Sequence, residues 1–145
     1  MKLSTRTRYG LRFLLQLAGN VQEDFPLQLR EVSKREGISG KYLGQIASQL
    51  RVAGLVKSVR GAGGGYKLAR PPSDITLKDV IEALEGGIIP ADCLEGTSCS
   101  RVSECVAREV WIGVKVEIEK ALAKLTLQDA VELGKKKCLT LDFSI

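Results

Sequence analysis

With 145 residues, of which 44% are hydrophobic and 27% charged, the chain is long enough for one domain with a buried core, and its composition excludes collagen-like, mucin-like and wholly disordered proteins. It contains no histidine, which excludes histidine acid–base catalysis, Ser-His-Asp and Cys-His systems and imidazole metal sites, so we expect no enzyme activity. The net charge of +5 is uneven: residues 1–70 hold 13 Lys and Arg with 4 Asp and Glu (net +9), and residues 71–145 hold 9 with 13 (net −4). The basic half favours a polyanionic partner, and a surface charge that only aids solubility is the alternative.

Helical signals open the chain. Ser4 can cap a helix over residues 5–18, a second helix is predicted over residues 29–36, and a third runs from Ser39 to Gly54. The buried face of the first helix would carry Tyr9, Phe13, Leu14 and Leu17. Two short helices separated by a glycine-containing turn are typical of a helix-turn-helix.

A β-hairpin is predicted next. Residues 55–59 alternate as an antiparallel strand does, residues 61–65 form a glycine-rich turn, and residues 66–68 return as the second strand. A glycine cluster can instead cradle a nucleotide phosphate, but Tyr66 stands where that fingerprint needs its last glycine, and no helix follows the turn. The helices and the hairpin together predict a winged helix-turn-helix DNA-binding domain over residues 1–75.

A connecting part is predicted over residues 76–103. Thr76 and Asp79 form a capping box that begins a helix over residues 77–85. Residues 88–103 show no periodicity and contain two of the four cysteines, so we interpret them as an irregular, functional loop.

The last part of the chain, residues 104–145, is predicted to form a long dimerisation helix and a C-terminal segment. Residues 103–125 fit both strand alternation and helical spacing, but their length and the strong helix formers of their second half favour a helix. Its first half is apolar nearly all round and therefore needs burial on more than one side, which a second copy of the chain would supply. We expect a homodimer whose interface contains Trp111, Val114, Ile118 and Leu122.

The C-terminal segment begins with a second capping box. Thr126 and Asp129 predict a short helix to about Lys136, and from Leu139 the chain is expected to be extended or loose. The predicted fold class is therefore mainly α with a small β-hairpin wing, a winged helix-turn-helix followed by a long dimerisation helix.

Candidate DNA-binding residues lie at the start of the third helix and on the hairpin. The major groove of duplex DNA admits a helix whose first residues approach the bases, and an arginine beside glycines suits a minor groove or a phosphate. We expect DNA contacts from Ser39, Gly40, Lys41, Tyr42, Gln45, Ser58, Arg60 and Gly61. Taken singly, each of these polar residues also fits an ordinary solvated surface, but their combination with the basic charge favours DNA binding. A dimer would bind a partly palindromic double-stranded operator of about 20–30 base pairs.

Three cysteines are regularly spaced. Cys93, Cys99 and Cys105 follow a C-x5-C-x5-C pattern, and thiolates that converge from one loop would form a soft metal site. Small buried hydrophobic residues, or a redox pair that forms a disulfide, are the alternatives. Cys138 lies apart, beside three lysines, and is interpreted as a structural or incidental thiol.

The start of the chain bears on its location. Arg6, Arg8 and Arg12 stand where a signal peptide needs its apolar segment, and no run of 18 apolar residues exists. We therefore expect the cysteines of such a chain to be reduced thiols that serve metal or redox chemistry and not disulfides. We therefore expect a cytoplasmic protein without a membrane partner.

The chain resembles the IscR-type transcriptional regulators of the Rrf2 superfamily, which include NsrR-like and CymR-like members, over nearly its whole length. The likeness rests on Met1-Lys2-Leu3-Ser4 with Tyr9, Gly37-Ile38-Ser39, Tyr42-Leu43, Leu50-Arg51, Gly54-Leu55-Val56, Ser58-Val59-Arg60-Gly61, Gly63-Gly64-Gly65-Tyr66, and the three cysteines followed by Trp111. It implies a dimeric winged-helix repressor or activator whose long helix forms the dimer interface. Members of the family sense iron–sulfur status, nitric oxide, cysteine supply or redox state. The resemblance implies that Cys93, Cys99 and Cys105 hold a [2Fe-2S] or [4Fe-4S] cluster.

Two departures from the family pattern matter. Arg108 stands where IscR-type members complete the cluster site with histidine, and Arg8 stands where related members take a ligand from the first helix; arginine ligates in neither case. The fourth ligand is left open among Asp92, Glu95, Glu104, Cys138 and a small molecule. Gly44 replaces a glutamate of the recognition helix, so the operator is not expected to match that of IscR. A cluster-free regulator of the CymR type, controlled by a partner protein or by thiol redox state, is the alternative function.

Overall fold

The computed structural model describes residues 2–96 and 99–142. The described elements are α1 (Thr5–Gly19), η1 (Val21–Glu23), α2 (Leu29–Glu36), α3 (Gly40–Val52), β1 (Val56–Val59), β2 (Gly65–Leu68), η2 (Pro72–Asp74), α4 (Leu77–Glu85), η3 (Asp92–Leu94), α5 (Val106–Ala123) and α6 (Leu127–Asp142), where η marks a short 3-10 helix. This is the predicted mainly helical architecture with one small hairpin.

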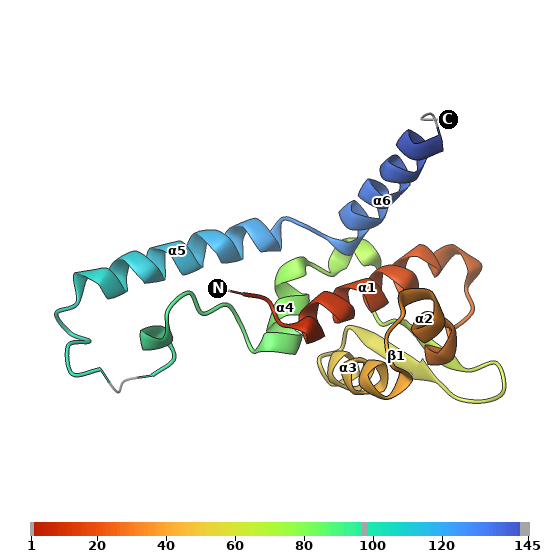
Figure 1. Ribbon diagram of the computed structural model, residues 1–145, viewed down its shortest axis with the longest axis horizontal. Coiled ribbons are helices and arrows are strands. Elements are labelled where there is room, and N and C mark those ends of the chain that lie inside the picture. Colours follow the sequence, from red (N-terminus) through yellow and green to blue (C-terminus); the bar gives the residue numbers. More distant parts are fainter. Residues whose placement is uncertain (1, 97–98, 143–145) are drawn as a thin grey trace.

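The molecule has a compact part and an extended part (Figure 1). Helices α1 to α4 and the hairpin form the compact part, and α5 runs out to one side of it. The chain between α4 and α5 reaches out to the far end of α5, so the cysteine-containing segment lies remote from the hairpin. Helix α6 leaves the compact part in another direction.

The helices begin at the residues that the caps predict. The hydroxyl oxygen of Ser4 accepts a hydrogen bond from the Thr7 backbone N–H at 3.3 Å. At the start of α4, the Thr76 backbone N–H donates to Asp79 Oδ2 at 2.8 Å, and the Asp79 N–H donates to Thr76 Oγ1 at 3.2 Å. Each bond satisfies a backbone group that a helix end would otherwise leave unpaired. Gly37 ends α2 with a φ of 65°, in the left-handed region that glycine tolerates best.

The core lies between α1, α3, α4 and the hairpin. Phe13, Leu14 and Leu17 are buried as predicted, whereas Tyr9 is only half-buried. The apolar faces of α3 and α4 are also buried: Leu43, Ile46, Ala47, Leu50, Val80, Ile81 and Leu84. Each fully buried leucine or isoleucine contributes about 1.5–3 kcal/mol relative to an exposed one, so these faces determine which side of each helix faces solvent.

The hairpin is held by more than its own two strands. β1 and β2 pair antiparallel in the register Val56↔Leu68 to Val59↔Gly65. Leu27 forms a further bridge to Tyr66. The Leu27 N–H donates to the Tyr66 carbonyl with 3.0 Å between nitrogen and oxygen, and the Tyr66 N–H donates to the Leu27 carbonyl at 2.8 Å. A side chain at Gly65 would place its Cβ 2.3 Å from the Leu27 carbonyl oxygen, so only glycine allows this approach. The base of the wing is thereby attached to the segment that precedes α2.

The start of α6 returns to the compact part, which the sequence pattern did not predict. Leu127 is fully buried in the same core as the N-terminal helices. Its backbone N–H donates to the Ile75 carbonyl at 2.9 Å, and the Leu77 N–H donates to the Leu125 carbonyl at 2.8 Å. The C-terminal end of α5 is therefore attached to the compact part through residues 125–127.

Two predictions about the C-terminal half have different outcomes. Residues 106–123 form the predicted long helix, not a strand. The expectation that the chain is extended or loose from Leu139 is wrong, because α6 continues past Lys136 to Asp142. No proline or glycine interrupts the sequence after Gly134, so nothing local stops the helix there. No described helix is long and apolar enough to cross a membrane.

Candidate nucleic-acid interface and cysteine segment

Helix α3 presents a polar face because its apolar face is buried. Leu43 and Leu50 point into the core, so Lys41, Gln45 and Gln49 are exposed on the other side. The helix adjoins the hairpin directly, since the Leu55 N–H, next to β1, donates to the Leu50 carbonyl at 3.0 Å. A helix with an exposed polar face beside a hairpin is the arrangement of a winged helix-turn-helix.

Two of the predicted DNA-binding residues also have structural roles. Ser39 is exposed, and its hydroxyl oxygen caps α3 by accepting a hydrogen bond from the Tyr42 backbone N–H at 3.2 Å. Tyr42 is half-buried, and its ring packs edge-on against that of Tyr9 with 6.1 Å between the ring centroids. Gly40 and Lys41 are exposed at the first turn of the helix. The start of α3 is therefore both exposed to a ligand and held firmly against α1.

A hollow of about 550 Å³ lies between the start of α1 and α3. Arg6 lines it together with Tyr42, Gln45 and Gln49, which places a cation beside the recognition helix. Sequence reasoning did not assign Arg6 to the DNA-binding set, although the +9 charge of the first 70 residues indicated it. Arg12 is used differently: its Nε lies 2.6 Å from Glu36 Oε2, and the pair ties α1 to α2.

The predicted wing residues Ser58, Arg60 and Gly61 are all exposed. Arg60 makes no ion pair with any described residue, so its guanidinium is available to a ligand. Gly61 has a φ of 107°, and the Gly64 N–H closes the turn on the Gly61 carbonyl at 3.0 Å. The turn holds Arg60 at the end of β1 on a well-defined backbone.

The three regularly spaced cysteines lie on the segment between α4 and α5. Cys93 lies in η3, Cys99 follows the residues that the structure does not describe, and Cys105 caps α5. Cys93 and Cys105 are half-buried and Cys99 is exposed, and all three are free thiols. Cys138 is exposed on α6 and belongs to a different element.

The cysteine segment fits a soft metal in its chemistry but not in its arrangement. Three thiolates are the donors that iron–sulfur clusters use. Among residues 2–96 and 99–142, however, no three Cys, Asp or Glu side chains come together as a metal-binding group. The carboxylates considered as a fourth ligand, Asp92, Glu95 and Glu104, are included in that result.

The two arginines singled out in the sequence, Arg8 and Arg108, have different surroundings. Arg8 is exposed, and its Nη2 donates to Thr5 Oγ1 at 3.0 Å. Arg108 lies in the first turn of α5, and its Nε is buried without a hydrogen-bond partner in the described part of the chain.

Helix α5 has an apolar surface that the described chain leaves uncovered. None of its eighteen residues is buried. The predicted interface residues Trp111 and Val114 are 42% and 37% exposed, and Ile118 and Leu122 are half-buried. Val106 and Val110, which the sequence analysis did not name, are exposed at 77% and 58%. An exposed apolar stripe of this length marks an interaction surface.

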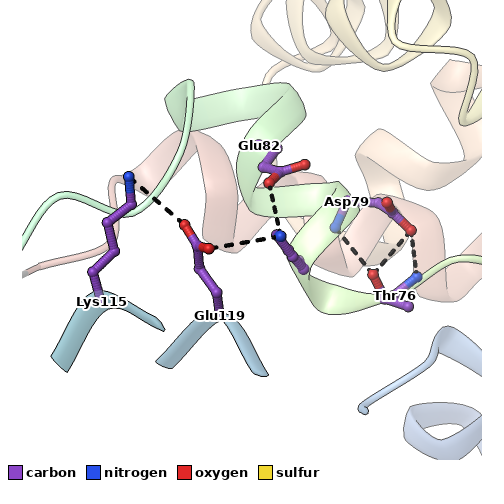
Figure 2. A network of polar contacts seen from close by, with 6 residues as sticks. Thr76, Asp79, Glu82, Lys115 and Glu119 are labelled. Carbon is purple, nitrogen blue, oxygen red and sulfur yellow. Dashed lines mark hydrogen bonds and ion pairs between the residues drawn. The ribbon is translucent and has the colours of Figure 1, made fainter. Parts of the chain in front are cut away.

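One ion pair, between Lys78 and Glu119, joins α5 to the compact part, and two others flank it (Figure 2). Glu119 of α5 lies 3.7 Å from Lys78 Nζ and 3.8 Å from Lys115 Nζ, and Lys78 also lies 3.5 Å from Glu82. The neighbouring capping box of Thr76 and Asp79 determines where α4 begins and hence where Lys78 stands. These contacts orient the long helix against α4.

Comparison with known proteins identifies similar chains over most of this length. A model of the Rrf2 family, described as an iron-dependent transcriptional regulator, matches residues 3–133. The HTH-type transcriptional regulator CymR of Bacillus subtilis (strain 168) is 42% identical over 129 residues, which cover 89% of this chain and 88% of CymR.

Two solved structures have the same fold over nearly the whole chain. CymR, the global cysteine regulator of B. subtilis, aligns with a TM-score of 0.78 at 38% identity and covers 92% of this chain and 98% of its own. IscR of T. potens aligns with a TM-score of 0.77 at 39% identity and covers 94% and 90%.

Proposed function

The chain belongs to the Rrf2 family of transcriptional regulators and is not an enzyme, and from this premise we propose that it acts as a homodimer on double-stranded DNA under the control of its cysteine segment. A regulator of this kind works beside the chromosome, so we propose a cytoplasmic location.

The DNA contact that we propose uses α3 in the major groove and the hairpin as a wing. The observation that carries this proposal is the exposed polar face of α3, which lies beside the hairpin that bears Arg60. Arg60 forms no ion pair with any residue that the structure describes. Ser39, Gly40, Lys41, Tyr42 and Gln45 are the proposed contacts of the helix, and Ser58, Arg60 and Gly61 those of the wing. Gly44 offers no side chain to the bases, so the polar groups beside it carry the readout.

DNA binding is tested without knowledge of the operator. Genomic fragments are selected on the purified protein, and the affinity for the preferred duplex is measured by fluorescence anisotropy at two salt concentrations. We expect a partly palindromic site of about 20–30 base pairs, because two-fold symmetry places two recognition helices about one helical turn apart. Equal affinity for selected and random duplexes at every salt concentration would contradict specific regulation.

The dimer that we propose pairs the α5 helices of two copies. Its support is the apolar surface around Trp111 and Val114, which this chain does not cover within its described residues. A stable interface buries about 1,200–2,000 Å² in total, so the exposed apolar residues of α5 would form the centre of such an interface and not the whole of it.

For the sensing part, we propose that Cys93, Cys99 and Cys105 act together and hold an iron–sulfur cluster. The soft donor set and the family's description as iron-dependent support this proposal. The fourth ligand of the cluster is not assigned; the candidates are Asp92, Glu95, Glu104, Cys138 and a small molecule. When bound, a cluster would link the segment before α5 to the redox and iron state of the cell.

A cluster-free regulator is the second candidate. It is favoured by the finding that no described metal-binding group gathers around these cysteines and by arginine at positions 8 and 108. In this case the exposed Cys99 and the half-buried Cys93 and Cys105 act as thiols, or a partner protein supplies the control.

The two candidates differ in one measurement. Protein purified without oxygen, and protein reconstituted with iron and sulfide, are examined for iron content and for visible absorption. A coloured, iron-containing protein supports the cluster. A colourless protein without iron in both preparations supports the cluster-free candidate.

A further inference from the structure

A hollow of about 350 Å³ lies behind the wing, at a place that neither the DNA-binding residues nor the cysteine segment uses. One wall is the segment from the end of α1 through η1, and the other is β2 with the residues that follow it. The size is within the range of pockets that bind small molecules, near its lower end. We name this hollow the wing-base pocket.

The walls of the wing-base pocket are mostly apolar. The contributing side chains include Leu17, Val21, Phe25, Tyr66, Leu68 and Pro72. Phe25 and Val21 remain 50% and 47% exposed, although both face a preformed hollow. A ligand that covers an exposed aromatic ring beside an apolar hollow removes apolar surface from water, and this stabilises the bound state.

The backbone around the pocket is held in place. The Asn20 amide donates to the Phe25 carbonyl at 2.8 Å, and Lys67 Nζ donates to the Asp24 carbonyl at 3.0 Å. Asp24 has a φ of 50°, a conformation uncommon for a residue other than glycine, and its carboxylate also pairs with Lys67 at 2.5 Å. A loop fixed by these bonds presents a formed site and not a transient gap.

The charged residues of the pocket are mostly positive. Lys57, Lys67 and Arg70 supply three cations, and Asp24 is the only carboxylate in the described lining. Lys67 and Asp24 neutralise each other, and Lys57 makes no ion pair within the described chain. Arg70 reaches a carboxylate outside the pocket, Asp79, only at 3.8 Å. The rim therefore has one cation without an ion pair among the described residues, Lys57, and a second, Arg70, whose ion pair is long.

We propose that the wing-base pocket binds a small amphipathic anion, a carboxylate joined to a compact apolar or aromatic body. The body would lie against Phe25 and Tyr66, and the carboxylate would face Lys57 and Arg70. Charge complementarity selects the anionic form of such a ligand, and the apolar walls select against inorganic anions. This site is independent of DNA binding and of the cysteines.

The test uses sodium phenylacetate as the probe and its neutral amide, phenylacetamide, as the matched control. Each is titrated into the full-length protein, and the backbone amide signals are followed by NMR. We expect saturable shifts with phenylacetate that are confined to the lining segments, and at least about fivefold weaker binding of phenylacetamide. Shifts that map to α5 or α3, absence of saturable shifts, or equal binding of the two compounds would overturn the proposal.

Variants separate the two parts of the site. Lys57→Gln removes a rim cation and should weaken phenylacetate binding about three- to tenfold, whereas Lys34→Gln, an exposed lysine of α2, should leave it unchanged. Phe25→Ala removes an apolar wall and should weaken both probes, and Val52→Ala, at an 85% exposed position of α3, serves as its control. All four positions are at least partly exposed, so the fold should be retained. Unchanged binding in both Lys57→Gln and Phe25→Ala would exclude the pocket as the site.

Discussion

At the scale of single residues, several side chains serve the fold and the interface together. Ser39 caps α3 while it remains exposed at the first turn, and Tyr42 packs on Tyr9 beside the same surface. Arg60 differs from them because no ion pair with a described residue restrains it. A substitution at Arg60 therefore reports on DNA binding with little effect on folding.

Replacing Arg60 by alanine should weaken binding to the preferred duplex by about 1–3 kcal/mol if the side chain reads a base or a groove. If it contacts only a phosphate, all duplexes should be weakened alike, and the slope of log K against log salt should fall by about one. Anisotropy titrations on selected and random duplexes distinguish these results. Lys124→Ala, after the end of α5, is the control for loss of one positive charge.

Glu85 is a residue whose role sequence reasoning missed. Its Oε1 accepts hydrogen bonds from the Ser4 backbone N–H at 2.8 Å and from the Thr7 hydroxyl at 2.6 Å, which joins α4 to the start of α1. Partial burial acts to raise the pKa of Glu85, but the hydrogen bonds from Ser4 and Thr7 outweigh it, so the pKa lies below its usual value of 4.5. The folded protein thus favours the carboxylate more than the unfolded chain does.

This lowered pKa predicts a pH dependence of stability. The contribution of Glu85 is fully present above the unfolded pKa and is lost as the pH falls through the lower folded pKa. Glu85→Gln should therefore destabilise the protein at pH 7, and its difference in free energy of unfolding from the wild type should shrink in acid. Urea unfolding at several pH values measures this. A difference that stays constant or grows in acid would refute the assignment, and Thr7→Val, which removes one donor, should fall between the two proteins.

At the scale of elements, the two C-terminal helices differ in what covers them. The start of α6 is part of the core through Leu127, whereas α5 is joined to α4 by the ion pair between Lys78 and Glu119 and has no buried residue. Surface ion pairs contribute little to stability, about 0–1 kcal/mol each. The pair between Lys78 and Glu119 thus orients α5 more than it stabilises the fold.

Leu127→Ala should destabilise the compact part by about 2–5 kcal/mol, because it leaves a cavity among residues that come from the N-terminal half. Leu133→Ala on the same helix, at a 63% exposed position, should change the free energy of unfolding by less than about 0.5 kcal/mol. Chemical denaturation of both variants provides the comparison. Equal effects of the two substitutions would mean that α6 does not dock as described.

Ile118→Lys should convert the proposed dimer to monomers, because it buries a charge in the apolar surface that two α5 helices would share. Light scattering measures the mass, and circular dichroism checks that the fold is retained. Glu117→Lys, at an exposed neighbouring position, should stay dimeric. A folded Ile118→Lys variant that remains a dimer would show that the interface lies elsewhere.

At the scale of the whole molecule, the cysteine segment links two working parts. It leaves the compact part after α4 and enters α5 at Cys105, so its conformation bears on how the DNA-binding part is held against the long helix (Figure 1). A change in this segment could alter the separation of two recognition helices in a dimer. A differential binding energy of about 5.5 kcal/mol shifts a two-state population from 1% to 99%, and smaller values give partial switching.

If the three cysteines act as a unit, Cys93→Ala, Cys99→Ala and Cys105→Ala should each abolish iron binding and the response of DNA binding to oxygen or nitric oxide. Cys138→Ala, on the remote α6, should leave both unchanged and serves as the matched control. Iron content and operator affinity are measured for all four variants. A cluster retained in one of the three variants would remove that residue from the unit, and a cluster lost in Cys138→Ala would name it as the fourth ligand.

The sequence by itself determined the local structure and the chemical character of this protein. Ser4, Ser39 and the box of Thr76 and Asp79 predicted the starts of α1, α3 and α4, because caps and glycine stops act within a few residues. The uneven charge predicted a DNA partner, which membership of a family of transcriptional regulators supports. The second copy of the chain and the soft metal site, predicted from the long helix and the three cysteines, stay predictions.

Only the tertiary structure decided which distant segments meet. Leu127 enters the N-terminal core, Glu85 accepts a hydrogen bond from a hydroxyl 78 positions away, and Leu27 pairs with Tyr66 of the hairpin. It also decided that no three Cys, Asp or Glu side chains gather as a metal-binding group within residues 2–96 and 99–142, which equal spacing along the chain did not indicate. Periodicity and capping report interactions between residues a few positions apart, whereas these contacts depend on how buried faces pack together, and packing is a property of the whole chain.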